Sequence, residues 1–119
     1  MSGRQMSVDE RTVLHHVLSD YPVLHAQVDK AKVIRPWAPG STSVDLHVPD
    51  DSPPCDNLPS PLSFPIADDA GTFTGWLLVW LEHGRLSALE HAWVTDEQPT
   101  ELPPARQTGK HDGNTLSRA

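Results

Sequence analysis

The chain has 119 residues, and its 16 Asp and Glu against 9 Lys and Arg give a formal net charge of −7 at pH 7. That acidity, without a basic stripe for phosphate backbones, excludes nucleic acid from the expected partners. No apolar run approaches the roughly 18 residues that cross a bilayer, so no membrane partner is expected. The first residues lack the apolar run of a signal peptide, and Cys55 is the only cysteine, which together predict a cytoplasmic protein.

Two helices are expected at the start of the chain. Ser7 and Glu10 stand at the spacing of a capping box, in which each side chain bonds the backbone N–H of the other residue. Apolar residues then recur at helical spacing, which predicts an amphipathic helix over 8–19. Pro22, a residue favoured in a first helical turn, opens a second helix that is expected to end near Lys30.

Strands are expected after the helices. Short apolar or alternating runs predict three of them, over 32–35, 43–48 and 62–66. Pro65 lacks a backbone donor and so places the third at a sheet edge. Residues 72–81 and 85–94 then form a long hairpin. This order predicts an α+β fold, in which two N-terminal helices pack on a mostly antiparallel sheet of about five strands that ends in the hairpin.

The expected domain covers residues 1–104. Its length suits a single hydrophobic core that needs no disulfide. Residues 105–119 show no apolar periodicity, and we expect them to form a disordered C-terminal tail. The proline-rich stretch over 49–61 fits no regular element, and a loop of that length is either functional or mobile.

The hairpin contains the candidate site. A two-residue turn at His83-Gly84, with glycine supplying a positive φ, places Glu82 opposite Arg85. Paired residues share a face, so one face carries a tryptophan-rich set as the candidate partner or ligand surface: Trp76, Trp80, His91 and Trp93. Glu90 falls on the other, aliphatic face as a candidate perturbed carboxylate. The tryptophans fit either a core or a binding surface, and the register depends on the assumed turn.

Catalytic, metal and cofactor sites are not expected. The adjacent His15 and His16 point about 100° apart on a helix, and one cysteine excludes a cysteine-rich zinc site. No serine lies in a glycine-flanked elbow, and no glycine-rich loop is present to hold a phosphate. Glu90 and His91 are neighbours on a strand and so point to opposite faces, which prevents them from acting as an acid–base pair unless a bulge intervenes.

A C-terminal motif carries a resemblance. The segment from Gly84 to Pro103 reads GRLSALEHAWVTDEQPTELP. It resembles the motif G-R-L-S-x-L-E-x-x-W-x-T-D-E-x-P-T-x-L-P of small uncharacterised proteins from high-GC actinobacteria. The resemblance covers about the last third of the ordered chain and implies a structured exit from the last strand, around Thr95-Asp96-Glu97 and Pro99. It implies no function.

Two functions remain open. The first is a non-enzymatic protein-interaction module, immunity-like or accessory, that binds a protein partner or forms a homodimer through the tryptophan-rich face. The alternative is a small-molecule-binding or hydrolase-like domain with a pocket between sheet and helices and Glu90 as its polar group. Burial of Glu90 beside a cavity, without a cationic partner, would favour the alternative. An ion-paired or exposed Glu90 would favour the first.

Overall fold

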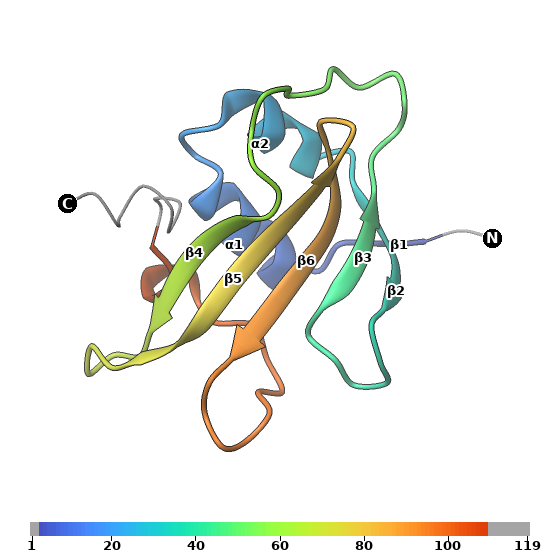
Figure 1. The fold of residues 1–119 in the computed structure, drawn as a ribbon. Coiled ribbons are helices and arrows are strands. Elements are labelled where there is room, and N and C mark those ends of the chain that lie inside the picture. Colours follow the sequence, from blue (N-terminus) through green and yellow to red (C-terminus); the bar gives the residue numbers. More distant parts are fainter. Residues whose placement is uncertain (1–2, 110–119) are drawn as a thin grey trace.

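Two helices and six strands form an α+β fold over residues 3–109, which the computed structural model describes (Figure 1). In chain order the elements are β1 (Arg4–Gln5), α1 (Val8–Val17), α2 (Pro22–Val28), β2 (Lys32–Pro36), β3 (Val44–His47), β4 (Leu62–Ala67), β5 (Phe73–Glu82), β6 (Arg85–Trp93) and the short 3-10 helix η1 (Ala105–Gln107). Every strand pair is antiparallel, and the order across the sheet is β1-β2-β3-β6-β5-β4. The predicted α+β class with an antiparallel sheet is therefore confirmed, with six strands instead of about five.

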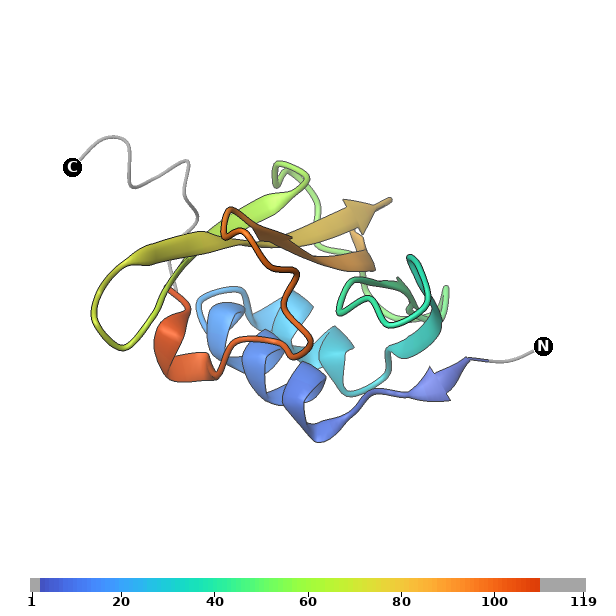
Figure 2. The same ribbon diagram turned by 90° about the horizontal axis from the view of Figure 1, so that it is seen from below.

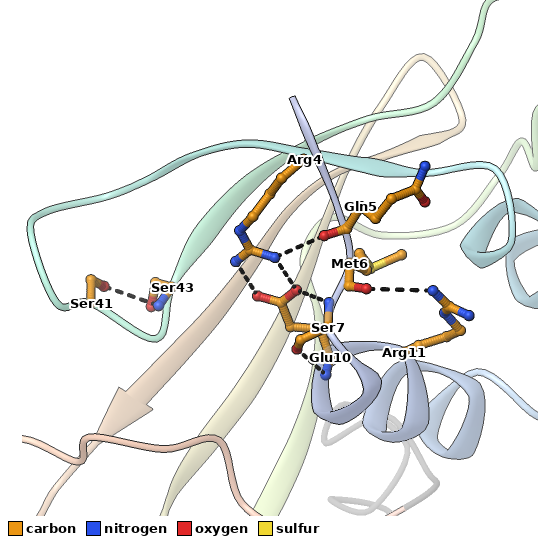
Figure 3. A network of polar contacts seen from close by, with 8 residues as sticks. All are labelled: Arg4, Gln5, Met6, Ser7, Glu10, Arg11, Ser41 and Ser43. Carbon is orange, nitrogen blue, oxygen red and sulfur yellow. Dashed lines mark hydrogen bonds and ion pairs between the residues drawn. The ribbon is translucent and has the colours of Figure 1, made fainter. Parts of the chain in front are cut away.

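The extra strand, β1, is held against α1 by an ion pair. Arg4 donates two hydrogen bonds of 2.9 Å to the carboxylate of Glu10, one to each oxygen. Glu10 also accepts from the backbone N–H of Ser7 at 2.8 Å, while the Ser7 hydroxyl accepts from the N–H of Glu10 (Figure 3). The predicted capping box is confirmed. A strand of two residues is too short to show alternation, which explains why β1 was missed.

The helices lie on one side of the sheet (Figure 2). The core between the two layers includes fully buried leucines of α1 and α2 together with Phe64, Leu77 and Leu89 from the sheet. On the opposite side of the sheet Figure 2 shows no helix in the described part of the chain. Within residues 3–109 no helix has the length and apolar character needed to span a bilayer.

A β-bulge in β6 overturns the predicted hairpin register. The pairs next to the turn are as predicted, with Glu82 opposite Arg85, but the register shifts between Trp80 and Leu81, so that Trp80 faces Ala88. Ser87 is the extra residue of this bulge. Beyond it every side chain of β6 lies on the face opposite to the predicted one.

Burial explains the bulge. With Ser87 as the extra residue, Leu86 and Leu89 both face the core and both are almost fully buried. A regular ladder would turn Leu89 to solvent, at a cost of about 1.5–3 kcal/mol. It would also move the carboxylate of Glu90 into the core without an ion-pair partner. The expectation that Glu90 lies on the aliphatic face is therefore wrong.

The proline-rich segment is fastened to the hairpin turn. Gln27 of α2 is buried and donates from Nε2 to the carbonyls of Pro53 and Gly84, while its Oε1 accepts from the N–H of Leu86 at 3.0 Å. The N–H of Cys55 donates to Gly84 at 2.8 Å. We call this set the Gln27 clasp, because it joins α2, the segment before β4 and the β5–β6 turn.

The tail boundary predicted at residue 105 falls within ordered chain. Residues Ala105–Gln107 form η1, and Thr108 forms an antiparallel bridge with Ile66 of β4. The N–H of Gly109 donates to the carbonyl of Pro65 at 2.9 Å. This segment therefore pairs with part of β4. The position of β4 at the edge of the sheet is the one that Pro65 predicts. The remainder of the predicted tail, 110–119, lies outside the described residues.

Candidate functional site

The sheet side that faces away from the helices, called here the open face, is the candidate site. The strand registers assign a shared set of side chains to it, among them Asp45, Ser63, Pro65, Trp76, Leu78, Trp80, Ala88, Glu90 and Ala92. Most of these side chains are partly exposed, in contrast to the fully buried core residues that alternate with them. An antiparallel sheet with one covered face usually presents polar residues on the other. The apolar and aromatic side chains on the open face depart from that pattern.

A hydrogen bond between Trp80 and Glu90 lies at the centre of the open face. The indole Nε1 of Trp80 donates to Oε1 of Glu90 at 2.9 Å. Both side chains are half-buried, and no Lys or Arg of the described residues forms an ion pair with Glu90. The bond fixes the orientation of the indole ring and occupies one carboxylate oxygen. The second oxygen has no protein partner within residues 3–109.

A shallow depression borders Trp80 on the β3 side. Its volume is about 780 Å³, and Trp37, Trp80 and Ala88 are among the residues that line it. Trp37 is 46% exposed, and its Nε1 donates to Oδ1 of Asp45 at 3.0 Å. Arg35 pairs with the other oxygen of Asp45 at 3.2 Å. Two tryptophans, each with its indole N–H on a carboxylate, therefore border the same hollow.

A second aromatic pair extends the open face toward β4. Phe73 is 45% exposed and meets Trp76 edge-on, with ring centroids 5.4 Å apart. A bulge next to Ile66 places Phe73 opposite Ala67, on the same face as Trp76. Edge-to-face pairs of this kind add roughly 0.5–1.5 kcal/mol beyond area burial. The aromatic side chains thus continue from Phe73 through Trp76 and Trp80 to Trp37.

His91 and Trp93 do not belong to this surface, so the predicted set is divided. The bulge at Ser87 places His91 opposite Leu77 and Trp93 opposite Gly75, on the helix-facing side. His91 is 6% exposed, and its Nδ1 lies 3.3 Å from the hydroxyl of Thr42. Desolvation lowers the pKa of His91 from its ordinary value of 6.5, because burial disfavours the imidazolium. Trp76 and Trp80 share the open face, as the sequence predicts, and Glu90 joins them there, which the sequence prediction missed.

The small-molecule alternative places Glu90 in a pocket between the sheet and the helices, and Glu90 does not face that layer. It lines a hollow of about 440 Å³ together with His91 instead. A separate pocket of about 280 Å³, lined mainly by apolar side chains, lies between α2 and the proline-rich segment, and includes Val23, Lys30 and Pro53. The nearby hydroxyl of Ser52 is buried without a hydrogen-bond partner in the described part of the chain. Among residues 3–109 no three His, Cys, Asp or Glu side chains are grouped to hold a metal.

The motif that carried the resemblance spans β6 and the segment that follows it. After β6 the N–H of Val94 donates to the carbonyl of Thr74, and the hydroxyl of Thr95 donates to the carbonyl of Glu97 at 3.0 Å. Leu102 packs against the core. Comparison of the chain with family models, curated proteins and solved structures gives no match. The actinobacterial resemblance stays a prediction from the sequence.

Proposed function

We propose that the chain is a non-enzymatic protein-interaction module that binds a protein partner through the open face. The observation that carries the proposal is the aromatic surface around Trp76 and Trp80, on a sheet side that no helix of residues 3–109 covers. Tryptophan is enriched among the side chains that contribute most to protein interfaces. In this account α1 and α2 cover one side of the sheet, and a partner covers the other.

The orientation of the indole rings supports the proposal. Hydrogen bonds to Glu90 and Asp45 fix Trp80 and Trp37 before any partner arrives. Side chains that are already ordered lose less rotamer freedom on binding, which favours affinity. The acidity and small size of the chain suit an immunity-like or accessory role.

A photo-crosslinking experiment tests the proposal. A photoreactive amino acid replaces Leu78, at the centre of the open face, or Val8, which is 76% exposed on α1. Proteins crosslinked in the source cells from position 78 and not from position 8 are purified, and their affinity is measured by calorimetry against the unmodified chain. Light scattering on the same samples reports self-association.

Substitutions then assign the binding to the face. We expect Trp76→Ser and Leu78→Thr each to lower the affinity of the purified partner at least tenfold, or about 1.4 kcal/mol. Val8→Thr is the matched control and should leave the affinity unchanged. Far-UV circular dichroism confirms that each variant is folded. The proposal is wrong if both open-face variants bind every partner as tightly as the unmodified chain. A dimer that dissociates in the same variants would instead identify a second copy as the partner.

A further inference from the structure

We infer that the partner places an arginine side chain on the open face, stacked on Trp80 and paired with Glu90. This inference rests on the proposed function and names the chemistry that the partner must bring. Three observations carry it: the apolar neighbours of Glu90 on β5 and β6, the fixed indole beside it, and the charge of the chain.

Glu90 sets the first requirement. Its carboxylate has Leu78 directly opposite on β5 and Ala88 and Ala92 on either side on its own face of β6. The Trp80 N–H satisfies one oxygen, and no cation of residues 3–109 pairs with the group. A partner that covers the face removes water from the second oxygen. A carboxylate buried without a cation or enough donors is strongly unfavourable, so the partner must supply a positive donor at this position.

Trp80 selects arginine. The guanidinium group is planar, so it can lie over an indole ring and at the same time donate in its own plane to a carboxylate. An ammonium group is compact and strongly hydrated, and gives up its water less readily at such a contact. Because the Trp80–Glu90 hydrogen bond holds the ring and the carboxylate in fixed positions, both groups are in place before the arginine arrives.

A second copy of the chain does not meet this requirement. Glu90 lies on β6 between β3 and β5, and these three strands contain one Lys or Arg, namely Arg85. Arg35, which borders the hollow beside Trp80, already pairs with Asp45. The guanidinium of Arg85 is already bonded to the carbonyls of Ser52 and Asp50. Two copies would also bring together two chains of net charge −7. Charge therefore favours a partner with a basic binding segment over self-association.

The test uses the full chain and three peptides. The probe is Ac-Gly-Arg-Gly-Arg-Gly-amide, and the two comparison peptides carry citrulline or lysine in place of arginine. Binding is followed by NMR through the indole N–H resonance of Trp80. We expect this resonance to shift saturably with the arginine peptide, with affinity at least about threefold weaker for lysine and at least about tenfold weaker for citrulline, which keeps the shape and loses the charge.

Two substitutions that each remove one negative charge complete the test. Glu90→Gln retains an acceptor for the Trp80 N–H and removes the carboxylate, and we expect it to weaken arginine-peptide binding about tenfold. Glu101→Gln, an exposed position outside the sheet, changes the net charge equally and should have no effect. Equal affinity for Glu90→Gln and the unmodified chain overturns the inference, as does the absence of a Trp80 shift. If the crosslinked partner still loses binding in Trp76→Ser and Leu78→Thr, only the arginine assignment fails. If it does not, the proposed function fails as well.

Discussion

Replacement of Gln27 tests how the proline-rich segment is held to the hairpin turn. Gln27→Met keeps the length of the side chain and removes both hydrogen-bonding groups of the Gln27 clasp. The N–H of Leu86 is buried and loses its acceptor, which costs about 1–3 kcal/mol. The carbonyl of Pro53 loses a donor, at about 1 kcal/mol, whereas that of Gly84 keeps the N–H of Cys55. The free energy of unfolding should therefore fall by about 2–4 kcal/mol.

Urea unfolding measures this loss of stability, and the reactivity of the Cys55 thiol reports whether the proline-rich segment has become more accessible. Cys55 is half-buried within the fastened segment, so its reaction with a thiol reagent should accelerate in Gln27→Met. Gln98→Met, at an exposed position, is the matched control and should change stability by less than about 0.5 kcal/mol. A loss below that value in Gln27→Met, with unchanged thiol reactivity, would refute the assignment of the clasp as a structural fastening.

Three further predictions concern the other polar contacts. Burial raises the pKa of Glu10, but hydrogen bonds from Arg4 and Ser7 and the charge of Arg4 outweigh it and lower the pKa below 4.5. The resulting stability is complete above pH 4.5 and lost as pH falls through the lower folded value, so urea unfolding of Glu10→Gln should show a weaker acid dependence than the parent. Because the pKa of His91 is lowered, the neutral imidazole stabilises the fold above pH 6.5, and this stability is lost as the pH falls below 6.5. His91→Gln should reduce the loss of unfolding free energy between about pH 7.5 and 5.5. An unchanged loss would contradict the burial argument. Trp80→Phe removes the indole donor to Glu90 and should lower the free energy of unfolding by about 1 kcal/mol, measured by thermal unfolding. An unchanged free energy would contradict a stabilising role of this hydrogen bond.

The sequence predicts the elements of this fold well because their signals are local. The capping box at Ser7, the proline at the start of α2 and the edge position of β4 each follow from the chemistry of one or two residues. The candidate site was predicted only in part. Trp76 and Trp80 share a face because both lie on β5, four residues apart, and side chains alternate regularly between the two faces of the sheet from one to the other.

The error in β6 has one cause, the insertion of Ser87. A signal for it is present in the sequence, since Leu86 and Leu89 are the large aliphatic residues of the strand and stand three positions apart instead of two or four. Two small residues, Ser87 and Ala88, lie between them and accommodate the bulge. The competition between a buried Leu89 and a buried Glu90 depends on which face the helices cover, and that is a tertiary property that no local pattern reports.

Solvent paramagnetic relaxation, measured by NMR with a neutral gadolinium chelate, tests the central claim most directly. In the free chain the chelate should broaden the indole resonances of Trp76 and Trp80 and leave the core methyl groups of Leu89 sharp. In the complex with the crosslinked partner, the broadening at both indoles should disappear, while that of the exposed Val8 persists. Equal broadening of Trp76 and Trp80 in the free chain and in the complex would show that the partner binds elsewhere and would contradict the account.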